Sequence, residues 1–161
     1  MSEASTKGPD LPLRKPIGWA DVVQTLWSIR GLSLDASRKR SLRRTWLRTF
    51  WMGRVDAARR CAEIAGFRVS YCTYRSLHHL FRELFVGQEY GWSLDTPRPR
   101  IVDCGSNIGM SVLYFKWMYP EAQITAFEPD PEAFACLEAN VRDNKLSGVD
   151  LHRKAVAGQA G

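Results

Sequence analysis

Two stretches decide the fold, Arg100-Ile-Val-Asp-Cys-Gly-Ser-Asn-Ile-Gly-Met110 and Gln123-Ile-Thr-Ala-Phe-Glu-Pro-Asp-Pro131. Each begins as a short apolar run, which is typical of a parallel strand buried on both faces. The first run ends at Asp103 and passes through a loop with two glycines into a segment of helical character. The second run ends at Glu128. The pattern predicts a strand, a turn, a crossover helix and a second parallel strand.

The loop between the first strand and the helix has residue types suited to holding a nucleotide. Gly105 and Gly109 lack the Cβ atoms that would block a sharp turn and keep a ligand off the backbone. We expect the helix N-terminus to present unpaired N–H groups to an electron-rich ligand. In open α/β sheets the ligand lies outside the carboxyl ends of the strands, where an acid on the next strand bonds the ribose hydroxyls. Glu128 is predicted to be that acid.

The spacing of the loop residues favours S-adenosylmethionine over a dinucleotide. Dinucleotide enzymes use G-x-G-x-x-G, whereas here an acid precedes the first glycine and a side-chain amide lies between the two glycines. The Asp103 carboxylate would repel a pyrophosphate but would attract the ammonium group of a methionine moiety. A dinucleotide site and an ordinary βαβ turn with chance glycines are the alternatives. The predicted cofactor-binding residues are Asp103, Gly105, Ser106, Asn107, Gly109 and Glu128.

Four stretches together match a known family. They are Glu83-Leu-Phe-Val-Gly-Gln-Glu-Tyr90, Ile101-Val-Asp-Cys-Gly-Ser-Asn-Ile-Gly-Met-Ser111, Ala126-Phe-Glu-Pro-Asp-Pro131 and Leu137-Glu-Ala-Asn-Val141. Through them, the chain from about Phe67 to Gly158 resembles the FkbM family of class I S-adenosylmethionine-dependent methyltransferases. The Glu-Pro-Asp-Pro run is the most family-specific of the four. Ser106 stands where members of the family often have Ala.

The resemblance implies an O-methyltransferase that acts on a hydroxyl of a sugar or another biosynthetic intermediate. It implies an α/β fold, a Rossmann-like class I methyltransferase core, of which this sequence supplies the first three parallel strands with their crossover helices. The resemblance implies that a complete core has seven strands, whereas this sequence supplies three. We therefore expect a fragment or truncated product that lacks most of the acceptor pocket and the catalytic residues. Its first strand would then have an unpaired edge.

The rest of the chain divides into segments by composition and periodicity. We expect a disordered tail without a signal peptide over 1–16, a helical N-terminal extension over 17–66, a strand–helix lead-in and linker over 67–99, and a partial S-adenosylmethionine-binding α/β core over 100–161.

Several elements are predicted within these segments. Apolar spacing predicts a helix from Trp19, a second from Ala36 to Gly53, and a third over Val55–Ala65 with Gly66 as its stop. We further expect a strand over Phe67–Tyr71, a helix with an apolar stripe closed by Gly87, a helix starting at Asp130, and a third core strand over Val149–Val156.

Charge is distributed unevenly along the chain. Residues 1–100 hold 18 Lys+Arg against 9 Asp+Glu, whereas residues 101–161 hold 5 against 8. The densest stretch, Arg38–Arg48, combines with Trp46, Phe50 and Trp51 into a basic amphipathic helix. Its cationic face could be merely solvated while the tryptophans pack on the core, could rest on an anionic membrane surface or an acidic glycan, or could contact nucleic acid phosphates.

Other residue types argue against metal chemistry and membrane insertion. Cys61, Cys72, Cys104 and Cys136 form no C-x-x-C pair and have no histidine at ligand spacing, so we expect a cytoplasmic protein without zinc. No run approaches the roughly 18–20 apolar residues of a membrane span. A structural role is favoured for the three histidines, and a packing or loop role for Cys104.

Three function classes follow from the sequence. The favoured one is a small-molecule or glycan O-methyltransferase. A nucleic-acid methyltransferase is supported only by the basic N-terminal half and is disfavoured. The third class is a non-catalytic remnant. The catalytic base, the acceptor and the oligomeric state are left open.

Overall fold

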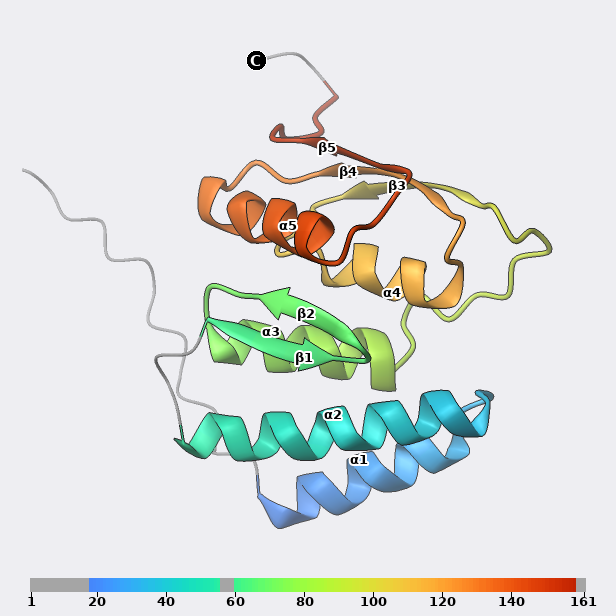
Figure 1. Ribbon diagram of the computed structural model, residues 1–161, viewed down its shortest axis with the longest axis vertical. Coiled ribbons are helices and arrows are strands. Elements are labelled where there is room, and N and C mark those ends of the chain that lie inside the picture. The colour runs from blue at the N-terminus through green and yellow to red at the C-terminus, as the bar shows by residue number, and fades with distance from the viewer. Residues whose placement is uncertain (1–17, 56–59, 159–161) are drawn as a thin grey trace, which may run out of the picture.

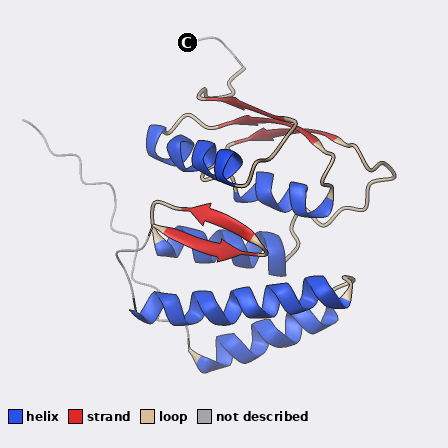
Figure 2. Cartoon of the chain, viewed as in Figure 1, coloured by secondary structure: helices blue, strands red, loops and turns tan. Residues whose placement is uncertain are grey.

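In the computed structural model of the chain, the described residues are 18–55 and 60–158, with side chains described for 18–51 and 60–158. The predicted disordered tail over 1–16 therefore lies outside the described residues. The elements are stacked in layers, with a helix pair at one end and a parallel sheet at the other (Figure 1, Figure 2). A hairpin and four further helical segments lie between them.

The α/β core consists of three parallel strands joined by two helices. The strands are β3 (Arg100–Cys104), β4 (Gln123–Phe127) and β5 (Val149–His152), in the order β3-β4-β5. Helices α4 (Met110–Met118) and α5 (Pro131–Asp143) make the two crossovers and lie on the same side of the sheet (Figure 1). The predicted α/β class with three parallel strands is thus confirmed.

Only one face of the sheet is covered. Ile124 and Ala126 point toward α4 and α5 and are buried, whereas Val102 on the opposite face is 69% exposed. Within residues 18–55 and 60–158, no helix lies on that opposite face and β3 pairs only with β4. Strand β3 is thus an edge strand of the sheet formed by the described residues.

Of two further core elements, β5 is shorter than predicted and α5 starts where it was predicted. Strand β5 ends at His152 rather than at Val156, because the Lys154 N–H turns back to the His152 carbonyl at 2.9 Å and leaves the strand direction. Helix α5 starts as predicted, since the Asp130 side chain accepts from the Ala133 N–H at 2.8 Å and Pro131 occupies the first turn.

The helix pair consists of α1 (Trp19–Gly31) and α2 (Ala36–Val55). The sides of α1 and α2 that face each other are apolar, as the helical spacing of apolar residues in both segments predicts. Helix α2 continues two residues beyond the predicted end at Gly53. The buried apolar residues of the pair are Val22, Ile29, Leu42, Trp46 and Phe50.

The predicted third helix over Val55–Ala65 is wrong where the chain is described. Residues Cys61–Ile64 form strand β1, which pairs antiparallel with β2 (Phe67–Ser70); residues 56–59 lie outside the described part. Ala65 and Gly66 have φ angles of 51° and 95°, as a two-residue hairpin turn of type I′ requires. Gly66 therefore makes a turn rather than a helix stop.

The apolar stripe after β2 is helical, as predicted, but changes pitch. Helix α3 (Tyr74–Phe81) continues directly into a π-helical segment, η1 (Arg82–Val86), which ends at the predicted Gly87. A Cβ at Gly87 would lie 2.8 Å from the Glu83 carbonyl oxygen, so the wide turn leaves room only for glycine. The buried residues of this stripe are Leu77, Phe81, Leu84 and Phe85.

Candidate cofactor site

The loop between β3 and α4 is bound to the end of the neighbouring strand. The backbone N–H groups of Gly105 and Ser106 both donate to the Phe127 carbonyl, at 2.8 and 2.9 Å. Phe127 is the last residue of β4, so the loop and the β4 terminus form one unit at the carboxyl ends of the strands. This is the edge at which ligands bind in open parallel sheets.

Glu128 lies between this loop and the start of α5. One carboxylate oxygen accepts from the Asn107 N–H at 2.7 Å and the other from the Asp130 N–H at 2.9 Å. The side chain is only 7% exposed. Because a carboxylate oxygen has two lone pairs, each oxygen retains one further acceptor position. The structure therefore brings Glu128 and the glycine loop together, as the sequence predicted.

Asp103 is oriented by two serines. Its carboxylate accepts a hydrogen bond from the Ser111 hydroxyl at 2.6 Å, and its backbone carbonyl accepts one from the Ser106 hydroxyl at 3.1 Å. Ser111 is in the first turn of α4 and is buried, so it holds the Asp103 side chain at the mouth of the loop. Ser111 was absent from the predicted site, although it closes the family-like stretch that begins at Ile101.

Positions 105 and 109 of the loop require glycine for different structural reasons. Gly105 has a φ of 92°, and a Cβ there would meet no atom within 4 Å, so its position faces open space. Gly109 has a φ of 84°, and a Cβ there would lie 2.5 Å from a terminal carbon of the fully buried Leu137. Gly105 thus leaves room beside the backbone, whereas Gly109 permits α5 to pack against the loop.

Asn107 also has a positive φ, of 49°. Asparagine tolerates this left-handed conformation because its short side chain can hydrogen-bond locally. Here its side-chain oxygen accepts from the Ile108 N–H at 2.8 Å. The amide between the two glycines therefore stabilises the loop's own backbone.

The expectation of unpaired N–H groups concerns the first turn of α4, which begins at Met110, and the loop before it is a separate case. The amides of Gly105, Ser106, Asn107, Ile108 and Gly109 all donate to acceptors within the protein. The loop itself therefore offers a ligand mainly acceptors, and the carboxylates of Asp103 and Glu128 lie beside it. Such an edge favours a cationic ligand with hydroxyl donors and disfavours a pyrophosphate, which needs N–H donors.

The side chain of Asn140 in α5 hydrogen-bonds to the loop, and the sequence did not predict this contact. Its side-chain nitrogen donates to the Ile108 carbonyl at 2.7 Å, while its oxygen accepts from the Ser70 N–H of β2 at 2.6 Å. It is 1% exposed. The signal in the sequence was a polar residue between the inward-facing Leu137 and Val141. Asn140 links the hairpin to the site, because one amide bonds both.

Two of the cysteines and two of the histidines contact neighbouring side chains. Among the described residues no group of three His, Cys, Asp or Glu side chains could hold a metal ion. The Cys72 and Cys136 sulfurs lie 3.6 Å apart, and burial together with this contact raises the pKa of Cys72 to about 12. Burial against Trp46 lowers the pKa of His78 to about 4. His152 stacks on Phe127, with ring centroids 4.9 Å apart.

Known proteins resemble this chain over the core. No protein-family model matches it. Methyltransferase 1 of Beauveria bassiana (strain ARSEF 2860) is 38% identical over 74 residues, 46% of this chain and 30% of that protein. The 31-O-demethyl-FK506 methyltransferase FkbM of Streptomyces tacrolimicus is 33% identical over 99 residues, 60% of this chain and 37% of that protein. Over this part of its length the chain is homologous to proteins named methyltransferase, one of which is FkbM.

These relatives are longer than this chain, which spans about a third of their length. A crystal structure of methyltransferase FkbM from Methylobacillus flagellatus KT covers 85% of this chain and 34% of its own, with 17% identity. Its TM-score of 0.39 is too low to bear on the fold.

Proposed function

We propose that the protein is an S-adenosylmethionine-dependent O-methyltransferase of the FkbM type. Its acceptor would be a hydroxyl of a sugar or another biosynthetic intermediate. The sequence similarity supports this, since the Streptomyces relative is named for acting on 31-O-demethyl-FK506. The observation that carries the proposal is the acceptor-rich edge at the carboxyl ends of β3 and β4, where Glu128 contacts the glycine loop at 2.7 Å.

Each predicted residue has a role in this proposal. The free lone pairs of Glu128 accept from the two ribose hydroxyls, and the Asp103 carboxylate attracts the ammonium of the methionine end. Gly105 lets the cofactor approach the backbone, since a Cβ there would project into open space. Ser106, Asn107 and Gly109 fix the shape of the loop around them.

The chemistry follows from the cofactor's own reactivity. Bound S-adenosylmethionine supplies a methyl group already activated by the positive sulfur. The contribution of these residues is to bind the cofactor and orient it, so that the acceptor oxygen can align with the bond that breaks. An electron-rich edge also stabilises the cationic cofactor more than its neutral demethylated product.

Calorimetric titration of the full chain tests the proposal. We expect S-adenosylmethionine to bind, and Glu128→Gln and Asp103→Asn each to weaken that binding about tenfold or more, because each removes a charge-assisted interaction. Glu132→Gln is the matched control, since Glu132 is an exposed acid in the first turn of α5. Unchanged affinity in the first two variants, or binding of NAD in place of S-adenosylmethionine, would refute the assignment.

A further inference from the structure

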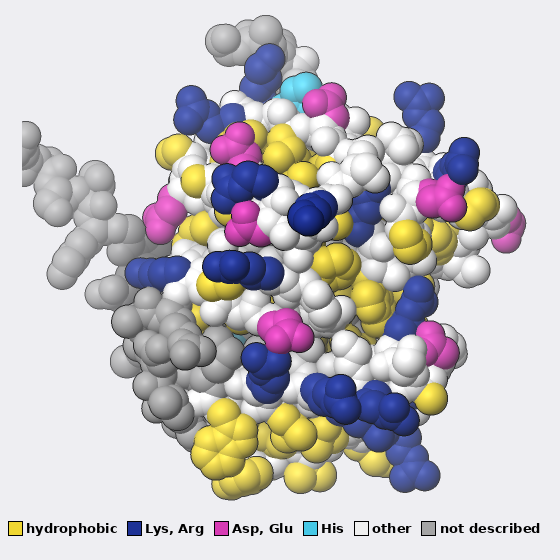
Figure 3. Space-filling model, viewed as in Figure 1, with side chains coloured by type: hydrophobic (Ala, Val, Ile, Leu, Met, Phe, Trp, Pro, Cys, Tyr) yellow, Lys and Arg dark blue, Asp and Glu magenta, His cyan; other side chains and the backbone are white. Residues whose placement is uncertain are grey.

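The helix pair exposes a group of large apolar side chains. Trp19, Val23 and Trp27 recur every four residues on α1, and Leu47 and Trp51 are four residues apart on α2. They are exposed by 40% for Leu47 up to 76% for Trp27. We call these five residues the aromatic face. Figure 3 shows apolar side chains gathered at this end of the molecule.

The aromatic face is distinct from the core of the helix pair. Trp46 and Phe50 of α2 are buried, so the sequence-based alternative in which the tryptophans pack on the core holds for Trp46 but not for Trp51. Trp19 contacts the core only by one side, with its ring centroid 5.3 Å from that of Phe50. Single exposed apolar residues are ordinary, but several on one face mark an interaction surface.

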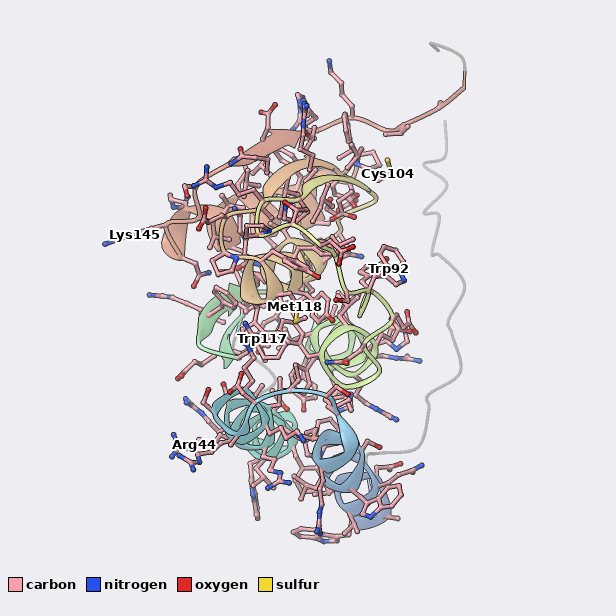
Figure 4. All side chains as sticks on the ribbon, turned by 90° about the vertical axis from the view of Figure 1, so that its right-hand side faces the viewer. Arg44, Trp92, Cys104, Trp117, Met118 and Lys145 are labelled. Carbon is pink, nitrogen blue, oxygen red and sulfur yellow. The ribbon has the colours of Figure 1, made fainter. Side chains whose placement is uncertain are left out.

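A basic band borders the aromatic face. Helix α2 contains seven Lys or Arg and no Asp or Glu. Arg48 pairs with Glu63 at 2.6 Å, but within the described part of the chain Arg40, Arg43 and Arg44 form no ion pair. These three exposed arginines are the basic band. Figure 3 shows a dense group of cationic side chains over α2, and Arg44 projects outward in Figure 4.

We propose that the aromatic face and the basic band dock the protein on an anionic lipid surface. Tryptophan suits the headgroup region because its ring is apolar while its N–H can still find a polar partner. Helices that lie in this plane combine an apolar face with Lys and Arg that attract anionic headgroups. No helix among the described residues is long and apolar enough to cross a membrane, so the contact is peripheral.

An anionic lipid surface suits both the aromatic face and the basic band, whereas a second copy of the chain or a nucleic acid suits only one of them. A second copy on the aromatic face would bring two unpaired arginine bands near each other, and like charges oppose such an interface. Nucleic acid would neutralise the arginines but would leave the aliphatic Val23 and Leu47 without an apolar partner. Figure 1 places the sheet at the end of the molecule away from α1, so docking leaves the candidate cofactor site open to water.

Flotation of the full chain with vesicles tests this proposal. We expect binding to phosphatidylcholine vesicles that contain about a third phosphatidylserine, little binding to pure phosphatidylcholine, and weaker binding at high salt. Trp27→Ala should reduce the partition coefficient about tenfold, because one indole no longer inserts. The double variant Arg43→Glu/Arg44→Glu should reduce it by at least about tenfold.

Two matched controls isolate the surface. Trp92 is also an exposed tryptophan, at 62%, and Lys145 an exposed cation, yet both lie far from α1 and α2 in Figure 4. Trp92→Ala and Lys145→Glu should therefore bind vesicles like the parent chain. All variants are compared by thermal unfolding, so that a loss of binding is not a loss of folding.

Three results would overturn the proposal. One is no preference for anionic vesicles. Another is a dimer in light scattering that Trp27→Ala dissociates, and the third is oligonucleotide binding that only the arginine variant abolishes. Cofactor affinity, measured on the same variants without vesicles, should stay unchanged. Failure of the docking proposal is thereby distinguishable from failure of the proposed methyltransferase function.

Discussion

The two ends of the molecule break opposite rules of protein surfaces. At the sheet end, polar side chains that usually lie in water are buried. Glu128 and Asn140 are two of them, and both hydrogen-bond to the backbone of the glycine loop. At the helix-pair end, tryptophans that usually lie inside are exposed beside unpaired arginines. Each departure has an energetic disadvantage, which points to a role beyond folding.

Charge follows the same division. The first hundred residues have twice as many cationic as anionic side chains, and the remainder has an acidic excess. In the folded chain the acidic groups Asp103 and Glu128 define the site, and the cationic band lies on α2. The comparison suggests that one end binds a small cationic cofactor while the other contacts a negative surface.

The largest expected effect is a pH dependence of stability at the contact between α3 and the helix pair. His78 is buried against Trp46, and this burial lowers its pKa from 6.5 to about 4. The unfolded chain therefore takes up a proton near pH 6.5 that the folded chain takes up only near pH 4. Between these values the free energy of unfolding should fall by up to about 3 kcal/mol as the pH is lowered.

Urea unfolding across this pH range measures the effect. His78→Phe should lose that part of the slope, because the ring is kept and the titration is removed. His79→Gln is the control, since His79 is exposed on the same helix and pairs with Glu83. Equal slopes in the parent chain and in His78→Phe would show that His78 does not couple protonation to folding.

The second prediction compares the two loop glycines. Gly109→Ala should reduce the free energy of unfolding by about 2 to 3 kcal/mol, since a positive φ adds to a clash with the buried Leu137. Gly105→Ala should reduce it by only about 1 kcal/mol from the positive φ alone. Denaturant unfolding measures both. Equal losses would mean that α5 does not pack on the loop as described.

Most of the sheet end was predictable from sequence because its signals are local. An apolar run, a glycine loop and an acid at the end of the next strand lie within thirty residues and follow the rules of a βαβ unit. The orientation of the loop amides was not predictable. It depends on the Phe127 carbonyl and the Glu128 carboxylate, which reach the loop from another strand.

The hairpin was missed because its pattern is short and ambiguous. Ala62 is inward-facing under both a helical and a strand period, and Gly66 is as suited to a helix end as to a turn. Tertiary contacts decide the case. The Ala65 N–H donates to the Thr45 hydroxyl of α2 at 3.0 Å. Asn140 of α5 and Asn144, which follows α5, bond the backbone of β2 from 70 and 76 residues away in sequence.

The third prediction concerns the stability of the site itself. Glu128→Gln should reduce the free energy of unfolding by about 2 kcal/mol, because an amide nitrogen would replace one acceptor and leave a backbone N–H unpaired. Glu138→Gln, an exposed acid on α5, should be neutral within about 0.5 kcal/mol. If Glu128→Gln were neutral as well, the carboxylate would not brace the loop in solution.

The smallest expected effect is the change in stability on Ala65→Gly, and its sign distinguishes a hairpin turn from a helix at this position. Ala65 has a φ of 51°, so Ala65→Gly should relieve strain and stabilise the chain by about 0.5 kcal/mol after the loss of one buried methyl. In a helix the same change would destabilise by about 1 kcal/mol. Thermal and urea unfolding together resolve the sign.

The central claim is that Asp103, Glu128 and the glycine loop bind S-adenosylmethionine, and an NMR titration tests it most directly. In a nitrogen-labelled chain, the amide signals of Gly105 and Gly109 should shift as the cofactor is added. The signals of Gly31 and Gly148 should stay in place, because they lie at the end of α1 and before β5. Shifts confined to other glycines, or no shifts at saturating cofactor, would contradict the account.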